Sequence, residues 1–189
     1  MAAQAAIDIQ AVALPAPGTW EIDPAHTMVE FVARHVLTKV RGRFDSFSGN
    51  IVVTDPPENS YVELEIDAAS IDTKVEDRDN HLRSADFLNV EQFPKLSFKS
   101  NAIRHMGGNI LQLDGDLTIK ATTRPVTLDV EFVGVHDSPF GTKLATFSAR
   151  TEIDREDWDI TWNLVIETGG WLVGKVVQLE LEIEAVYKG

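Results

Sequence analysis

The stretch VQLELEIEAVY, residues 177–187, decides the fold of this chain. Apolar side chains occupy every second position, and Glu180, Glu182 and Glu184 stand between them. Successive side chains of a β-strand point to opposite faces, so this period of two separates an apolar face from an acidic one. Such alternation is typical of an antiparallel sheet with one face in water.

The same alternation recurs along the chain from Trp20 onward. Turn signals separate the segments, among them Asp55-Pro56-Pro57 and Gly107-Gly108-Asn109. We predict about eight strands, which cover residues 29–35, 47–53, 62–66, 96–98, 111–119, 126–132, 145–149 and 177–187. A sheet of this kind hides its apolar face and its edges by closing on itself. We therefore expect an all-β protein with an eight-stranded antiparallel, lipocalin-like barrel.

The alternation breaks between Arg78 and Ser100, RDNHLRSADFLNVEQFPKLSFKS. Charged side chains crowd the first part of this stretch, and two phenylalanines and a proline follow. We expect a short helical excursion around residues 74–90 that lies over the barrel. An active site, a lid and a plug are the three interpretations, and the residues favour a lid or a plug.

Ion pairs are the expected means of fixing this excursion on the barrel. Arg78 is adjacent to Asp79, and Arg83 is three positions before Asp86. Side chains three apart are neighbours on a helix surface. A second interpretation places an arginine or histidine of this stretch at the barrel mouth, where it meets the polar head of a lipid.

Length and composition indicate one globular domain. The chain has 189 residues, of which 43% are hydrophobic and 25% charged. We assign residues 18–189 to the barrel and residues 1–17, which are rich in Ala and Pro, to a flexible N-terminal arm. The arm contains no Lys or Arg and does not match a secretory signal. We expect a cytoplasmic rather than a secreted protein.

Charge and cysteine content exclude several functions. The net charge of −13 would repel nucleic acid and anionic membrane surfaces, so neither is an expected partner. No apolar run reaches the ~18 residues that a membrane-spanning helix needs, so we expect no membrane-spanning segment. The chain contains no cysteine, which excludes disulfides, thiolate nucleophiles and cysteine metal sites.

Candidate catalytic and metal-binding residues do not assemble in the sequence. His26 and His35 are nine positions apart, which places them on opposite faces of an unbroken strand. No carboxylate cluster is tied to the histidines at a ligand spacing, so we expect structural histidines and no metal site. Ser46 and Ser84 lie outside any nucleophile elbow. We predict no catalytic residues and no cofactor, with a small metal- or histidine-dependent enzyme as an alternative.

Aromatic side chains are spread over nearly every predicted strand. Each alone is explained by core packing. Together, a barrel lined with large rings and aliphatic side chains also suits a long apolar ligand. The sequence does not separate a filled barrel from an open one.

Several motifs together resemble the YceI family of polyisoprenoid-binding, lipocalin-like barrels. The most diagnostic run is RDNHLRSADF at 78–87, with WEIDPAH at 20–26 before it and FPKLSFKS at 93–100 after it. In this order and spacing the motifs cover almost the whole chain from the first of them onward. Thr27 stands where Ser is commoner in the family, and Asp159 stands where Gly is expected.

The resemblance implies non-catalytic binding, storage or transport of a long-chain isoprenoid in the lumen. A polyprenyl lipid, a quinone or a quinone precursor would each fit. The residues predicted to line the lumen and contact this lipid are Phe31, His35, Phe44, Phe47, Leu64, Ile66, Phe87, Phe93, Phe98, Leu117, Phe132, Phe147, Trp158 and Trp162. The residues predicted to meet its head group are Arg41, Arg78 and His81. A stress-response or interaction module with a filled barrel is the alternative, and pairing of two chains into a homodimer through a barrel edge stays open.

Overall fold

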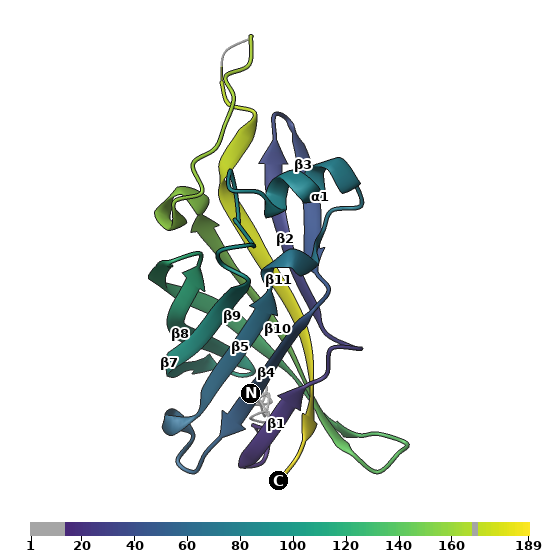
Figure 1. Cartoon of the computed structure of the whole chain (residues 1–189). Helices are drawn as coiled ribbons and strands as arrows, with labels where there is room; N and C mark the ends of the chain where they lie inside the picture. Colours follow the sequence, from purple (N-terminus) through teal and green to yellow (C-terminus); the bar gives the residue numbers. More distant parts are fainter. Residues whose placement is uncertain (1–13, 168–169) are drawn as a thin grey trace, which may run out of the picture.

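The computed structural model describes residues 14–167 and 170–189 and shows a closed β-barrel (Figure 1). Within these residues, eleven strands form one antiparallel sheet, and eight of them close into a ring in which β11 pairs with β1. The predicted eight-stranded antiparallel barrel is confirmed. In ring order the strands are β1 (Gly18–Ile22), β4 (Phe47–Val53), β5 (Tyr61–Asp67), β7 (Lys95–Gly107), β8 (Ile110–Ile119), β9 (Thr122–Asp137), β10 (Lys143–Asp154) and β11 (Val173–Tyr187).

Three further strands extend the sheet beside the ring, and they are β2 (Met28–His35), β3 (Thr38–Phe44) and β6 (Ile71–Asp72). The length of β11 explains this arrangement. Its last residues pair with β1, and its first part, up to Glu182, pairs with β2. We predicted the segment 29–35 as one of the barrel strands. It instead forms β2, outside the ring, and β1 pairs with the end of the same edge of β11 and closes the ring.

The expected helical excursion is present as α1 (Glu76–Arg83), which lies across the β3 and β6 end of the sheet (Figure 1). Acidic side chains occupy its first turn and basic ones its last turn, an order that suits the helix dipole. Among the described residues, no helix is long and apolar enough to span a membrane. Short 3-10 turns are η1 (Pro57–Asn59), η2 (Ala68–Ser70) and η3 (Arg155–Trp158).

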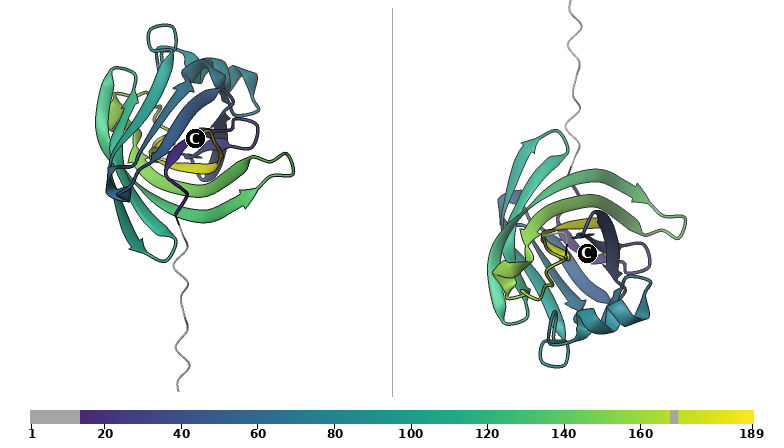
Figure 2. Two further views of the ribbon diagram at one scale, coloured as in Figure 1. Left: turned by 90° about the horizontal axis from the view of Figure 1, so that it is seen from below. Right: turned by 90° about the horizontal axis from the view of Figure 1, so that it is seen from above.

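The barrel has two different ends. The α1 end carries α1, the β2–β3 hairpin and the segment that joins β10 to β11 (Figure 1). The N-terminal end carries residues 14–17, η1 and the β7–β8 connection. Figure 2 shows the ring from both ends and the β9–β10 hairpin projecting away from it. Residues 1–13, most of the predicted flexible arm, lie outside the described residues.

Inward-facing side chains of the ring form one continuous apolar core. Trp20 and Phe132 are its largest almost fully buried members, each 1% exposed. The outward positions carry the glutamates and lysines that alternate with the core residues in the sequence. The periodicity of two therefore becomes an apolar interior and a charged outer face, as predicted.

Asp159 follows η3 and has a left-handed backbone, with φ of 58°. This conformation favours glycine, the residue that the resemblance led us to expect there. The Asp159 carboxylate accepts a hydrogen bond from Thr122 Oγ1, and its backbone carbonyl oxygen accepts one from Lys120 Nζ, both at 2.9 Å. The aspartate side chain thus adds one contact, to Thr122, that a glycine could not make.

Candidate functional site

A cavity of about 250 Å³ lies inside the barrel, in the half nearer the N-terminal end. Its walls are apolar, mostly Leu, Ile and Val, because each ring strand turns its apolar side chains inward. The lining side chains in the interior are Ile22, Ile51, Val53, Val62, Leu64, Phe98, Ile103, Leu111, Leu113, Leu128, Val130, Phe147, Ala149, Leu181 and Ile183. Such a space can take a long apolar group and offers nothing to a polar one.

Polar side chains enter the lining only at its rim. Among the described lining residues they are Glu58 and Ser60 at η1 and His105 near the end of β7. Ser60 Oγ accepts a hydrogen bond from the backbone N–H of Thr54 at 3.0 Å. His105 Nε2 lies 2.9 Å from the carbonyl oxygen of Gly108. These contacts fix the rim at the β4–β5 and β7–β8 connections.

The segment that precedes β1 borders the same rim, where Leu14 and Pro15 belong to the lining. Trp20 Nε1 donates to the carbonyl oxygen of Ala16 at 3.0 Å, and the Tyr187 hydroxyl donates to that of Pro17 at 3.1 Å. Residues 14–17, which we assigned to the arm, are therefore attached to the barrel beside the cavity.

The structure distributes the predicted lipid-contacting residues over three environments. Those that line the cavity are Leu64, Phe98 and Phe147. Those in the core or packed against it, away from the cavity lining, are Phe31, Phe44, Phe47, Ile66, Phe87, Leu117, Phe132, Trp158 and Trp162. Phe93 is half-buried in the segment after α1, and His35 is exposed at the end of β2. The aliphatic residues that form most of the lining were missed, although they share the same inward parity.

Aromatic packing at the α1 end explains this distribution. The ring of His81 lies edge-on to Phe87 and Trp162, with centroid distances of 5.0 and 4.5 Å. Trp158 is 2% exposed, and its Nε1 donates to the carbonyl oxygen of Leu117 at 3.0 Å. These rings pack against one another at the α1 end, whereas most of the side chains that line the cavity are Leu, Ile and Val.

The predicted head-group residues lie away from the cavity. Arg41 Nη1 is 2.7 Å from the carboxylate of Glu30 and 2.6 Å from that of Glu180, on the outer face. Hydrogen bonds to Glu180 and Glu30 raise the pKa of Arg41. Arg78 Nε donates to Thr73 Oγ1 at 2.7 Å, and His81 Nε2 lies 2.9 Å from an Asp86 carboxylate oxygen. None of the three head-group candidates belongs to the described cavity lining.

The expected ion pairs of the excursion are largely replaced by hydrogen bonds to the main chain. Arg83 donates to the carbonyl oxygens of Ala69 and Ile71, at 2.8 and 2.6 Å. Asp86 pairs with His81 instead. Carbonyl groups beside the short strand β6 need donors, and Arg83 supplies them because its guanidinium has several N–H groups in a fixed fork. The expected Arg83–Asp86 pair was therefore wrong.

Asp79 is the buried acidic residue of α1, with 6% of its surface exposed. Its Oδ1 accepts from the backbone N–H of Thr73 at 2.8 Å and from Thr73 Oγ1 at 2.5 Å. The Arg78 guanidinium completes the group through the carbonyl oxygen of Thr73 at 2.8 Å. The network joins α1 to the end of β6, which is a structural task.

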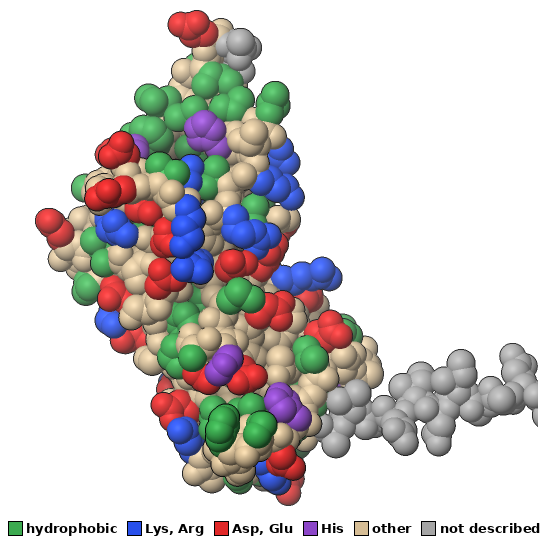
Figure 3. All heavy atoms as spheres, turned by 90° about the vertical axis from the view of Figure 1, so that its right-hand side faces the viewer, with side chains coloured by type: hydrophobic (Ala, Val, Ile, Leu, Met, Phe, Trp, Pro, Cys, Tyr) green, Lys and Arg blue, Asp and Glu red, His purple; other side chains and the backbone are tan. Residues whose placement is uncertain are grey.

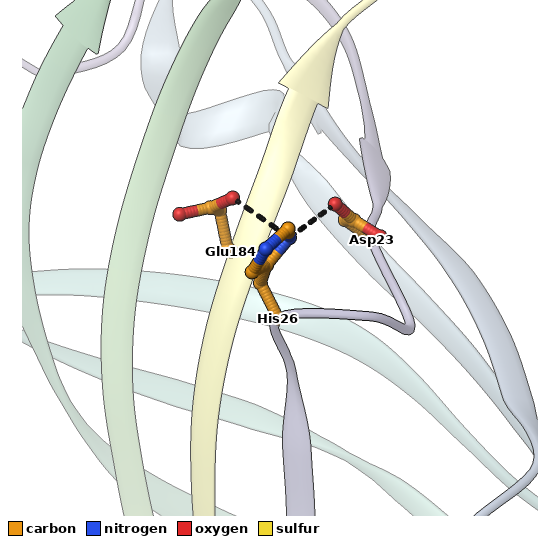
Figure 4. A group of neighbouring side chains, drawn as sticks. All are labelled: Asp23, His26 and Glu184. Atoms are coloured by element: carbon orange, nitrogen blue, oxygen red, sulfur yellow. Dashed lines mark hydrogen bonds and ion pairs between the residues drawn. The ribbon is translucent and has the colours of Figure 1, made fainter. Parts of the chain in front are cut away.

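A polar cluster occupies the outer face where β1 gives way to β2 along β11, and Figure 4 shows its three side chains pointing toward one another. His26 Nδ1 is 2.8 Å from an Asp23 carboxylate oxygen and 3.5 Å from one of Glu184. The hydrogen bond that His26 donates to Asp23 raises the pKa of His26, and the same bond lowers the pKa of Asp23.

This cluster corrects the expectation that no carboxylates lie near the histidines at a ligand spacing. One atom from each of its three residues lies within 4.8 Å of the others. The Asp23-x-x-His26 spacing was visible in the sequence, but Glu184 joins only through the pairing of β11. His26 is two-thirds exposed. We assign the cluster an ion-pairing role that joins the β1–β2 turn to β11.

Exposed apolar side chains gather at the α1 end of the molecule (Figure 3). Leu37 is 86% exposed in the β2–β3 connection, and Trp171 is 58% exposed before β11. The backbone N–H of Val36 donates to the carbonyl oxygen of Leu172 at 2.9 Å, which joins the two segments. This surface is at the opposite end from the cavity rim and is not part of the site.

The sequence matches the family model for the YceI-like domain over residues 20–185. Among curated proteins, UPF0312 protein SA2479 of Staphylococcus aureus strain N315 is 37% identical over 168 residues, which are 86% of this chain and 94% of that protein.

Solved structures share the fold. The crystal structure of Burkholderia cenocepacia BcnA has a TM-score of 0.72 at 25% identity, over 87% of this chain and 99% of that one. The Campylobacter jejuni YCEI protein has a TM-score of 0.71 at 26% identity, over 82% and 90%. A polyisoprenoid binding domain from Saccharophagus degradans has a TM-score of 0.70 at 12% identity, over 89% and 98%.

Proposed function

The chain belongs to the family of YceI-like domains, and we propose that its barrel binds the apolar chain of a lipid without catalysing a reaction on it. The observation that carries this proposal is the aliphatic cavity of about 250 Å³ with a polar rim at one end. Transfer of apolar surface from water into such a space yields about 25 cal/mol per Å². Affinity would therefore come from the tail of the ligand.

A long-chain isoprenoid is the first candidate for this lipid, as a polyprenyl lipid, a quinone or a quinone precursor. The branched, apolar isoprene units of such a lipid would contact the branched side chains of the Leu, Ile and Val residues that form most of the cavity walls. The solved Saccharophagus degradans domain is named for polyisoprenoid binding, and at 12% identity it supports the fold alone. The choice of isoprenoid for this chain is thus our proposal, resting on the cavity walls.

Storage or transport fits this geometry better than catalysis. Inside the rim, the cavity walls consist of hydrocarbon side chains, which neither transfer protons nor act as nucleophiles. The rival function, an interaction module with a filled barrel, accounts for the packed α1 half and leaves the cavity without a role.

Extraction and reloading test the proposal. Protein purified from its host is extracted with organic solvent, and the extract is examined by mass spectrometry. We expect a lipid with a long apolar chain at a stoichiometry near one per chain, and we expect the stripped barrel to bind added geranylgeraniol in a saturable manner. Failure of both extraction and reloading would support the filled barrel.

A further inference from the structure

We propose that the cavity selects lipids whose head is an uncharged hydroxyl group and disfavours the phosphate esters of the same lipids. This inference rests on the proposed lipid-binding function and concerns the head group alone. A lipid whose tail fills the aliphatic interior leaves its head at the rim, where Glu58, Ser60 and His105 begin the polar part of the lining. These side chains therefore decide which heads are accepted.

The charge of the rim disfavours an anionic head. Glu58 is exposed on η1, beside the strand β7 that carries His105. No lysine or arginine belongs to the described lining of the cavity. Proteins that hold phosphate groups usually supply arginine, lysine or convergent backbone N–H groups. A phosphate at this rim would instead face a carboxylate, on a chain whose net charge is −13.

The hydrogen-bonding groups of the rim favour a donor. His105 Nε2 lies 2.9 Å from the Gly108 carbonyl oxygen, which can only accept, so Nε2 carries the proton. In this tautomer Nδ1 is an acceptor. The Glu58 carboxylate is a second acceptor. A hydroxyl group can donate to either, whereas a fully ionised phosphate donates to neither.

Ser60 also allows the hydroxyl group of a ligand to act as a hydrogen-bond acceptor. Its Oγ accepts from the Thr54 N–H at 3.0 Å and lies 3.4 Å from Thr54 Oγ1. The Thr54 hydroxyl already donates to the carbonyl oxygen of Pro56 at 2.7 Å. The Ser60 proton is therefore available to Thr54 or to a ligand oxygen. A lipid alcohol, which both donates and accepts, satisfies this set.

A matched pair of ligands tests the inference on the full chain. Binding of geranylgeraniol and of geranylgeranyl phosphate is measured by titration calorimetry at a pH of about 8, where the phosphate is fully ionised. We expect the alcohol to bind at least about tenfold more tightly, which corresponds to about 1.4 kcal/mol. Glu58→Lys should raise the affinity for geranylgeranyl phosphate and so reduce the ratio of the two affinities, alcohol over phosphate.

Glu91→Lys is the matched control, because Glu91 is exposed in the segment after α1 and the substitution changes the net charge equally. It should leave the ratio unchanged. Equal affinities of the wild-type chain for both lipids, or tighter binding of the phosphate, would overturn the head-group inference and leave lipid binding in place. If Glu58→Lys and Glu91→Lys changed the affinity ratio equally, the inference would also be overturned, because the net charge and not the rim would then determine the selectivity. If neither lipid binds, the proposed function itself fails.

Discussion

Thr27 Oγ1 exchanges two hydrogen bonds with the backbone of Glu184, donating to its carbonyl oxygen at 3.2 Å and accepting from its N–H at 3.1 Å. Thr27 is 7% exposed and lies immediately before β2. Glu184 lies where β11 changes its partner, since Glu182 pairs with Met28 of β2 and Ala185 with Ile22 of β1. The two hydrogen bonds between Thr27 and Glu184 therefore fix the turn between β1 and β2. This turn allows both strands to pair with the same edge of β11.

Replacement of Thr27 by Val tests this role. The carbonyl oxygen of Glu184 keeps a hydrogen bond from the backbone N–H of Asp23 at 2.8 Å, but the Glu184 N–H loses its acceptor. A buried unpaired backbone group costs about 1–3 kcal/mol, and we expect the free energy of unfolding to fall by that amount. Urea denaturation followed by tryptophan fluorescence measures the loss. Thr27→Ser keeps the hydroxyl and loses only the methyl group, so it should cost less than half as much; a Thr27→Val chain as stable as wild type would show that the two hydrogen bonds do not fix this turn.

The cluster of Asp23, His26 and Glu184 predicts a pH-dependent stability. The pKa of His26 is raised above its ordinary value of 6.5, chiefly by the hydrogen bond that it donates to Asp23. Its contribution to stability is therefore fully present below pH 6.5 and is lost as the pH rises through the raised pKa. The pKa of Asp23 is lowered below 3.8, so its contribution is present above that pH and is lost as the pH falls through the lowered pKa.

The expected measurement is a comparison of wild-type and His26→Asn chains by urea denaturation at pH values of about 5.5 and 8.5, on either side of the ordinary histidine pKa. The difference in unfolding free energy between them should be larger at the lower pH. His136→Asn removes an exposed imidazole from the β9–β10 hairpin, outside the cluster, and serves as control. A wild-type advantage that does not change with pH would contradict the ion-pairing role of His26.

Sequence periodicity predicted the barrel because every ring strand carries a local signal, the inward parity of its apolar residues. It did not predict that β1 would close the ring in place of residues 29–35, since that depends on how far β11 extends beyond β2. Most of the residues that line the cavity were missed for a related reason. Aromatic residues attracted the prediction by their size, but size makes Phe47 or Trp158 fill space, and smaller residues such as Leu113 and Val130 leave it. Parity finds inward residues; it does not measure the volume between them.

The α1 segment should act as a fixed structural element and not as a moving gate. Asp79→Ala removes the acceptor of the Thr73 N–H and Thr73 Oγ1, both of which are buried with it. We expect a loss of about 2–4 kcal/mol in unfolding free energy, from two buried donors left without a partner. The affinity for geranylgeraniol should stay within about twofold of wild type, because the cavity lies in the other half of the barrel. A large change in affinity with the fold intact would identify α1 as a gate.

Arg155 forms hydrogen bonds that stabilise the connection between β10 and β11. It is 4% exposed, and its guanidinium donates to the carbonyl oxygens of Gly174 at 3.0 Å and of Ile160. Burial lowers the pKa of Arg155, against the opposing influence of Glu156 and Asp154.

We expect Arg155→Met to lower the unfolding free energy by roughly 2–3 kcal/mol, because buried carbonyl groups lose their donors. Arg155→Lys should recover only part of this, since an ammonium group cannot span both acceptors in the fork geometry of arginine. Thermal unfolding by circular dichroism compares the three proteins. Full recovery by Lys would show that positive charge alone is needed at this position.

Two valines on β9 provide the last test, because one lines the cavity and the other is exposed on the outside. Val130 lines the cavity and is 8% exposed, whereas Val133 is 58% exposed. Val130→Phe places a ring in the empty space, so we expect the affinity for geranylgeraniol to fall at least about tenfold, about 1.4 kcal/mol. Excess volume in a well-packed core costs about 1–3 kcal/mol, but a ring that enters a cavity should cost less. Val133→Phe adds the same ring on the outside and should leave both affinity and unfolding free energy near wild type. Calorimetric binding and urea denaturation are measured on both variants, and a folded Val130→Phe chain that binds the lipid as tightly as Val133→Phe would place the lipid outside the barrel.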